Sequence, residues 1–249
     1  MKYLFLLTAL LLFSCTHTPE IIVDKGAVFG VLSSDAHPSF TNKIRDKSSS
    51  ADDYRDENSQ GVIYHDNMVN YSQLNELYVG LVLPYYTPRE HHLFAEPEKM
   101  SPSSLALSSG DMLKIQNNTS STQHFFISDI EGEGFQSFPE LQAGQNAYFT
   151  VNIEGNLELL SEDNDALKVV LFSKKNMLTK KLFSGQRYQF ENLPPDSYQL
   201  IFWYWRLGKI EKTIRIEAQK NIRVDETLTV DSVMRSYHGC VINRTIDCK

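Results

Sequence analysis

The sequence has little of what defines several protein classes. Its 12 glycines and 9 prolines among 249 residues are too few for a collagen-like or fibrous chain. No run rich in Lys and Arg accompanies the aromatic residues, and the net charge of −7 gives no support for nucleic-acid binding. Motifs for a serine nucleophile elbow, a zinc protease or a phosphate-binding glycine loop are missing, so we expect no enzyme. A Ser–His–Asp triad has no such local motif, so a hydrolase with an unrecognised site stays a lower-ranked alternative.

The first fourteen residues combine a positive start with an apolar run that is too short to span a bilayer. The run ends in Leu12-Phe13-Ser14-Cys15, which resembles the lipobox of bacterial lipoproteins, although Phe13 is larger than the usual residue there. The resemblance implies that residues 1–14 are a signal peptide and that Cys15 is acylated. It also favours the outer membrane, because Thr16 replaces the aspartate that marks inner-membrane retention. An ordinary signal peptide with a chance cysteine is the alternative.

Residues 15–73 show one strand pattern, at 26–32. The polar run 46–60 has too little apolar surface to offset the cost of ordering, so we expect a loop or flexible insert. Its acidic residues could serve a calcium loop, but the Asp-x-Asp-x-Asp-Gly spacing is absent.

Residues 74–172 show the pattern of an antiparallel β-sandwich. The run 77–83 predicts a strong strand, which we assign to this sandwich. Alternating runs separated by Gly, Asn, Asp and Ser turns follow at 105–107, 112–117, 124–128, 148–151, 157–160 and 168–172. The sequence therefore predicts an all-β fold.

The order of Gly110-Asp111, a strand ending at Asn117, His124, Ala143-Gly144-Gln145 and Gly155 between strands resembles the cupredoxin family. The family implies a Greek-key sandwich, and its blue-copper members bind copper through a Cys thiolate, two His imidazoles and often a Met thioether. By the family's spacing, the Cys, second His and Met positions are occupied by Ser161, Asn164 and Leu167, so His124 is the only retained ligand type. We therefore expect no metal and no cofactor.

The role of His124 has alternatives. It could be a partly buried imidazole bonded to a neighbouring loop, or part of a non-standard copper or zinc site with His91 or His92. Only one of those two could join it, because adjacent residues of a strand point to opposite faces. Asp163 and Asp165 are oxygen donors that would suit a harder cation.

Residues 168–230 predict a second, smaller sandwich. The strand predicted at 168–172 could belong to the first sandwich or to the second. The phrase 192–203, Asn-Leu-Pro-Pro followed by a turn and an aromatic strand, resembles the carboxypeptidase-regulatory or transthyretin-like sandwich. The two sandwiches in one exported chain resemble methylamine-utilisation-like or plastocyanin-like proteins, which typically keep the Cys and His ligands.

The C-terminal tail, 231–249, holds the other two cysteines. An exported protein meets an oxidising compartment, so we predict a Cys240–Cys248 disulfide. Metal-binding thiolates beside His238 are the alternative.

Together these features predict a lipid-anchored, metal-free binding or scaffold module of the bacterial cell envelope. Its partners would be the outer membrane, through the anchor, and an envelope protein on the periplasmic or outer side. Candidate exposed aromatics for that role are Tyr85, Tyr86, Trp203, Tyr204 and Trp205. The alternative is a periplasmic copper-binding or electron-transfer protein with a non-standard site around His124.

Overall fold

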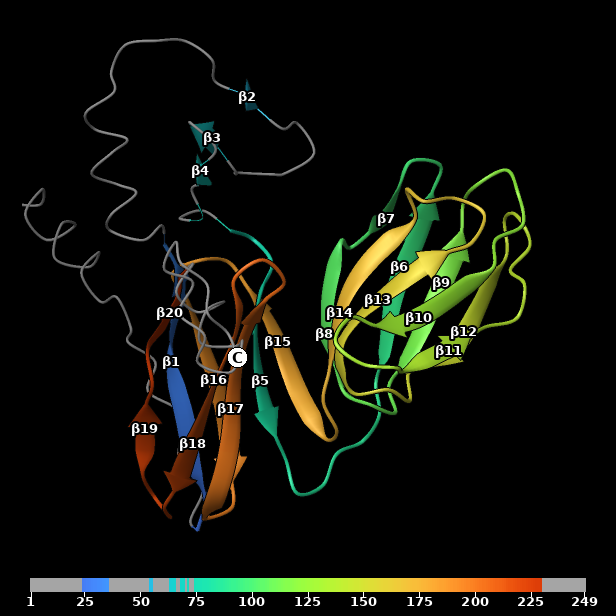
Figure 1. Cartoon of the computed structure of the whole chain (residues 1–249). Helices are drawn as coiled ribbons and strands as arrows, with labels where there is room; N and C mark the ends of the chain where they lie inside the picture. The colour runs from blue at the N-terminus through green and yellow to red at the C-terminus, as the bar shows by residue number, and fades with distance from the viewer. Residues whose placement is uncertain are drawn as a thin grey trace, which may run out of the picture.

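The computed structural model describes residues 24–35, 71 and 74–229, and the backbone of three short strands at 54–55, 63–65 and 68–69. The described residues form strands, turns and loops, and contain no helix (Figure 1). Among them, therefore, no helix is long and apolar enough to cross a membrane. The predicted all-β fold class is confirmed, and the sheets form two sandwiches.

The first sandwich contains the strands from β6 to β14 (Figure 1). One sheet has the order β11-β10-β13-β14-β8 and the other the order β12-β9-β6-β7. Alternate residues of these strands point between the sheets, as the period-two pattern predicts, and form a closed apolar core. The bounds are β6 Glu90–Glu96, β7 Lys99–Ser101, β8 Ser104–Leu107, β9 Met112–Asn117, β10 Phe125–Asp129, β11 Phe135–Ser137, β12 Asn146–Thr150, β13 Gly155–Ser161 and β14 Lys168–Ser173.

The second sandwich combines strands from both ends of the described chain. One sheet has the order β16-β1-β19, with β20 also pairing with β1, and the other the order β15-β5-β17-β18. The bounds are β1 Gly26–Ser34, β5 Leu77–Val82, β15 Met177–Leu182, β16 Gln186–Leu193, β17 Asp196–Tyr204, β18 Gly208–Ile216, β19 Asn221–Arg223 and β20 Glu226–Leu228.

The whole first sandwich is an insertion in the second. Strands β5 and β15 are neighbours in one sheet, and all strands from β6 to β14 lie between them in the chain. The assignment of the 77–83 strand to the first sandwich is therefore corrected, since β5 pairs with β15 and β17. Its sequence is apolar almost throughout, so it has no alternation that could tell one sheet from another. Strand β14, in contrast, pairs only within the first sandwich.

The sheet that contains β5 takes part in both cores. Val79 and Phe202 point into the second core, whereas Tyr78 and Trp203, the adjacent residue on each strand, belong to the first. The ring of Trp203 stacks on Phe172 of the first sandwich, with centroids 5.7 Å apart. Tyr78 Oη donates a hydrogen bond of 2.7 Å to the carbonyl of Ser104. The two sandwiches thus share one sheet as a common wall.

The five aromatics proposed as exposed differ in burial, and Tyr86 is intermediate. Trp203 and Tyr204 are buried, whereas Tyr85 is 90% exposed and Trp205 is 37% exposed. The hydroxyl of Tyr86 donates to Asp111. A binding surface can therefore include only some of them.

The N-terminal segment contains more strands than predicted. Besides β1, the short strands β2 (Tyr54–Arg55), β3 (Ile63–His65) and β4 (Met68–Val69) form a small sheet. Strands of two or three residues are too short to show a period-two pattern, so the sequence did not reveal them. Most of the polar run 46–60, the lipobox with Cys15, and the tail with Cys240 and Cys248 lie outside the described residues.

Candidate functional site

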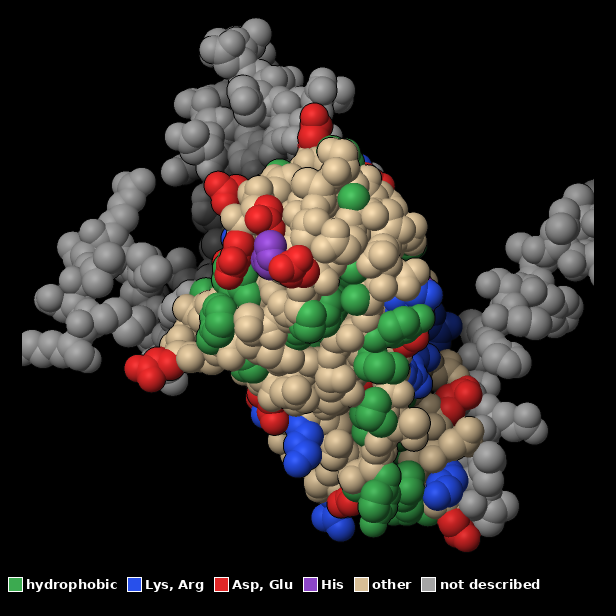
Figure 2. Space-filling view, turned by 90° about the vertical axis from the view of Figure 1, so that its right-hand side faces the viewer, with side chains coloured by type: hydrophobic (Ala, Val, Ile, Leu, Met, Phe, Trp, Pro, Cys, Tyr) green, Lys and Arg blue, Asp and Glu red, His purple; other side chains and the backbone are tan. Residues whose placement is uncertain are grey.

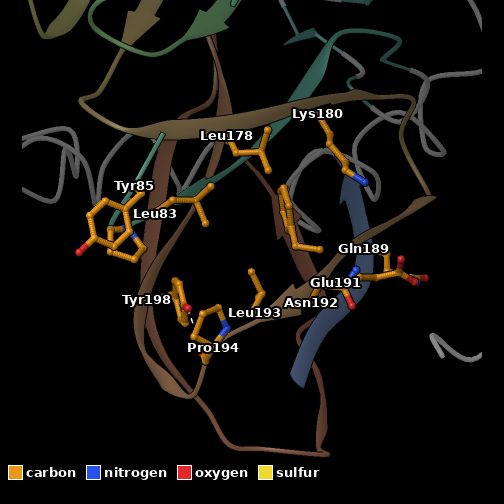
Figure 3. A pocket seen from close by; sticks show the side chains of 12 residues that line it. Leu83, Tyr85, Leu178, Lys180, Gln189, Glu191, Asn192, Leu193, Pro194 and Tyr198 are labelled. Atoms are coloured by element: carbon orange, nitrogen blue, oxygen red, sulfur yellow. Dashed lines mark hydrogen bonds between the residues drawn. The ribbon is translucent and has the colours of Figure 1, made fainter. Parts of the chain in front are cut away.

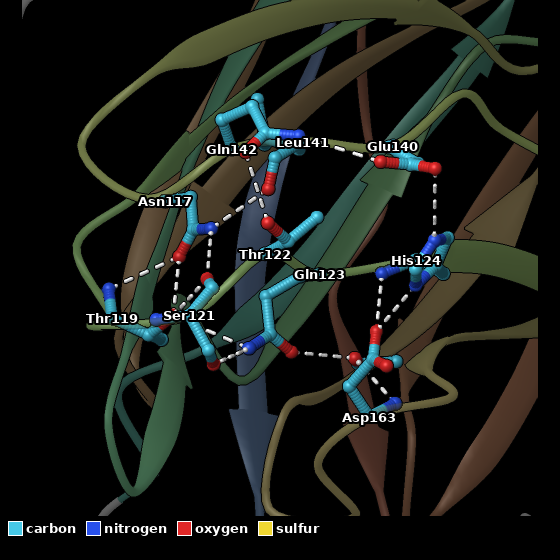
Figure 4. A network of polar contacts seen from close by, with 11 residues as sticks. Asn117, Thr119, Ser121, Thr122, Gln123, His124, Glu140, Leu141, Gln142 and Asp163 are labelled. Atoms are coloured by element: carbon cyan, nitrogen blue, oxygen red, sulfur yellow. Dashed lines mark hydrogen bonds and ion pairs between the residues drawn. The ribbon is translucent and has the colours of Figure 1, made fainter.

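The end of the first sandwich where β9 ends and β10 begins carries a polar cluster around His124 (Figure 4). Nδ1 and the backbone N–H of His124 both lie 2.7 Å from Oδ2 of Asp163, in the loop between β13 and β14. Nε2 of the same ring lies 3.6 Å from Oε1 of Glu140. On the face that the first sandwich presents in Figure 2, acidic side chains gather around a histidine.

The carboxylates favour the protonated form of this imidazole. The hydrogen bond to Asp163 raises the pKa of His124, and the same hydrogen bond lowers the pKa of Asp163. An imidazole that is protonated on both nitrogens has no free lone pair for a metal. The group is also no catalytic triad, because Nε2 faces the carboxylate of Glu140 and not a hydroxyl.

Ser161, Asn164 and Leu167, which stand where the cupredoxin spacing would place copper ligands, each make a contact of another kind. Ser161 is buried, donates from Oγ to Oε1 of Gln123 at 2.7 Å and accepts the backbone N–H of Asp163 at 3.1 Å. Asn164 donates from Nδ2 to the carbonyl of Pro97 at 2.9 Å. Leu167 is fully buried in the first core. Each position thus contributes to the fold through its present side chain.

Sequence reasoning missed the buried network that supports Ser161. Gln123 donates from Nε2 to Oγ of Ser121 at 2.8 Å and to Oγ1 of Thr119 at 3.2 Å. Asn117 donates from Nδ2 to the carbonyls of Ser121 and Leu141, both at 2.9 Å. The only signal in the sequence was the polar run after the strand that ends at Asn117. A satisfied buried network of this kind makes the loops at this end rigid.

His91 and His92 lie toward the opposite end of the first sandwich. Strand β6 runs parallel to β9, with His91 opposite Leu113 near the start of β9, whereas His124 follows the end of that strand. Nε2 of His91 lies 2.8 Å from Asp111, and Nε2 of His92 lies 2.8 Å from Glu90. The structure therefore does not bring either residue to His124, which corrects that alternative. Within the described part of the chain, no group of three or more His, Cys, Asp or Glu residues is placed to hold a metal ion.

Asp111 is the centre of a second polar cluster that the sequence did not reveal. The carboxylate is fully buried and accepts hydrogen bonds from Tyr86 Oη, Arg89 N–H, His91 Nε2 and Ser108 N–H, at 2.8 to 3.0 Å. Burial by itself would raise the pKa of Asp111, but these donors hold it below its ordinary value. The cluster fastens the connection from β5 to β6 onto the first sandwich, so its role is structural.

Comparisons with known proteins give only remote likenesses. No protein-family model matches the sequence, and no curated protein does. The chain is similar to a purple cupredoxin from Nitrosopumilus maritimus, with 14% identity and a TM-score of 0.30 over 33% of this chain and 98% of that one. It is similar to a copper-containing nitrite reductase from Thermus scotoductus, with 13% identity and a TM-score of 0.30 over 36% of this chain and 23% of that one. An amicyanin variant shows 13% identity and a TM-score of 0.30 over 38% of this chain and 98% of its own. Likenesses of this size carry no argument about function, which depends on the residues themselves.

Proposed function

We propose that the protein is a lipid-anchored, metal-free cupredoxin-like binding or scaffold lipoprotein of the bacterial cell envelope. The observation that carries this proposal is the set of contacts at the copper-ligand positions. Ser161 bonds to Gln123, Asn164 bonds to Pro97, and Leu167 packs in the core. A thiolate and two imidazoles are needed for a blue-copper centre, and here the replacements stabilise the sandwich end.

The anchor in this proposal is the acylated Cys15. Acyl chains bind the membrane with about 0.8 kcal/mol for each buried methylene, so several chains hold the protein firmly. The chain enters the second sandwich through β1, and that sandwich would be of the carboxypeptidase-regulatory or transthyretin-like kind. Its turn at Pro194-Pro195, between β16 and β17, supports this assignment. An envelope protein would be the partner, and a pull-down from outer membranes that recovers nothing above background would argue against a binding role.

We expect the protein to bind far less than one equivalent of copper. The chain carrying Cys15→Ser, which cannot be acylated, would be incubated with Cu²⁺, dialysed and measured by elemental analysis, beside the same chain with His124→Ala. Equal, trace amounts in both are the expected result, because both nitrogens of His124 face carboxylates. Stoichiometric copper that is lost in His124→Ala would favour the alternative, a periplasmic copper-binding or electron-transfer protein with a non-standard site.

We expect Cys15 to determine where the protein fractionates. The unaltered protein should be found with outer membranes, and Cys15→Ser should move it to a soluble fraction because no acyl chain is attached. Cys240→Ser is the matched control and should leave the protein in the membrane. If Cys15→Ser stays with the membranes as well, the lipid-anchor proposal is wrong.

A further inference from the structure

The second sandwich contains a pocket of about 630 Å³ between strands β15 and β16 (Figure 3). Each of these strands is at the edge of its sheet, so no further strand closes the gap between them on this side. The volume is in the range typical of small-molecule sites. Its lining combines apolar side chains, among them Leu178, Phe190 and Leu193, with polar ones, among them Lys180 and Glu191.

Lys180 is an unusual component of this pocket. It lies on β15 between Leu178 and Leu182. Because alternate residues of a strand point to the same side, these three side chains share one face of β15. Leu182 is part of the second core and Leu178 packs against it, so this register places Lys180 on the core-facing side of β15, with its side chain exposed at the open edge of the pocket. Its ammonium lies 5.3 Å from the ring centroid of Phe190, and no described carboxylate forms an ion pair with it. Its neighbour Lys181 instead pairs with Glu76 at 2.9 Å.

A β-bulge shapes the opposite wall. Strand β16 pairs Phe190 with Val28 and Leu193 with Gly26, so Glu191 and Asn192 together oppose one residue of β1. Asn192 has a φ of 58°, in the left-handed region that one class of bulge uses and that Asn tolerates better than most residues. The extra residue turns Leu193 back into the pocket beside Phe190, and both belong to the second core. The hydroxyl of Tyr198 donates to the carbonyl of Pro194 at 2.8 Å and fixes the adjoining turn.

We propose that this pocket binds a small amphipathic anion, an aromatic or acyl carboxylate. Its apolar body would pack on Leu178, Phe190 and Leu193, and its carboxylate would pair with Lys180. A carboxylate is favoured over a neutral ligand because Lys180, the only cation of the lining, lies beside the apolar wall at Phe190, whereas Glu191, the one acid, is the next residue of β16 and is exposed to solvent, which screens its charge. An inward-facing lysine on an edge strand can also serve only to prevent strand pairing between molecules. A measurement of anion binding to the pocket distinguishes a binding role of Lys180 from this protective role. The proposal concerns the second sandwich and does not depend on the anchor or on the metal content.

Isothermal titration of the chain with Cys15→Ser tests it, with naphthalene-2-carboxylate and the neutral naphthalene-2-carboxamide as probes of the same shape. We expect one site that binds the carboxylate about tenfold more tightly than the amide, as a charge-assisted hydrogen bond allows. Lys180→Gln should remove that preference and leave the weak binding of the amide unchanged. Lys181→Gln is the matched control and should keep the preference, because Lys181 pairs with Glu76 outside the pocket lining.

Three results would overturn the proposal. The first is that neither probe binds, in which case Lys180 acts only against strand pairing. The second is equal affinity for acid and amide, which would make the pocket a neutral apolar site. The third is that Lys181→Gln weakens carboxylate binding as much as Lys180→Gln, which would show non-specific attraction to the two lysines. Far-UV circular dichroism and the urea midpoint of each variant establish that the fold is retained.

Discussion

We expect Trp203→Ala to lower the free energy of unfolding by about 3–5 kcal/mol, the cost typical of removing a large aromatic side chain from a core. Trp203 is only 2% exposed and packs in the first core, although its strand, β17, belongs to the second sandwich. Its ring contacts Tyr78 and Phe172, with centroids 5.6 and 5.7 Å away. The cavity left by alanine would therefore open at the common wall of the two sandwiches.

Urea unfolding followed by circular dichroism measures this effect, and the chain supplies its own control. Trp205 lies two residues further on, is 37% exposed and has the guanidinium of Arg206 over its ring at 4.3 Å. Trp205→Ala should cost less than about 1 kcal/mol, because a partly exposed side chain leaves no closed cavity. Equal losses for the two variants would show that the wall between the sandwiches is not tightly packed.

We expect Asp111→Asn to cost about 3 kcal/mol or more at neutral pH. Every group that faces this buried carboxylate is a donor, namely Tyr86 Oη, Arg89 N–H, His91 Nε2 and Ser108 N–H. An asparagine amide presents one oxygen and adds its own donors against them, so part of the set is left without an acceptor.

The same variant has a distinctive pH dependence. The pKa of Asp111 is lower in the folded protein than its ordinary value of about 4. Its ionised form therefore stabilises the fold fully above that ordinary value, and this contribution is lost as the pH falls through the lower, folded-state pKa. The difference in unfolding free energy between the wild type and Asp111→Asn should be largest at neutral pH and shrink in acid.

Asp163→Asn is the control for this experiment. Asp163 also accepts a hydrogen bond from a histidine, but both side chains of that pair are more than one third exposed, so solvent screens their interaction. Its loss should be a small fraction of that for Asp111→Asn. If the two variants lose equal stability, burial does not decide the value of these His–Asp pairs, and the role assigned to the Asp111 cluster is wrong.

The first sandwich could be predicted well from the sequence because its strands alternate. In the run from Met112 to Asn117, Leu113 and Ile115 share one face and are fully buried, whereas Met112 lies on the other face and is 39% exposed. Period-two alternation reports which side of a strand faces a core, and it needs no knowledge of the strand's neighbours. The resemblance to the cupredoxins also directed attention to Ser161, Asn164 and Leu167, but only the tertiary structure shows what these residues contact.

Tertiary structure alone decided which strands are neighbours. The run 77–82 is apolar on both faces, and its hydrogen-bond partners are about one hundred residues further along the chain, after the inserted sandwich. In the same way, Asp111 looks like an ordinary turn residue in the sequence, because its donors come from elsewhere: Tyr86 and Arg89 from the connection between β5 and β6, and His91 from β6.

Lys180 and Lys181 show the same division on the smallest scale. Once the two lysines lie on a strand, their being adjacent in the sequence requires that they face opposite sides of it. Only the pairing of β15 with β5, at the edge of a sheet shared by two cores, decided that Lys180 faces the pocket and that Lys181 pairs with Glu76. Local pattern depends on a residue's own strand, whereas a site depends on groups that meet from distant parts of the chain.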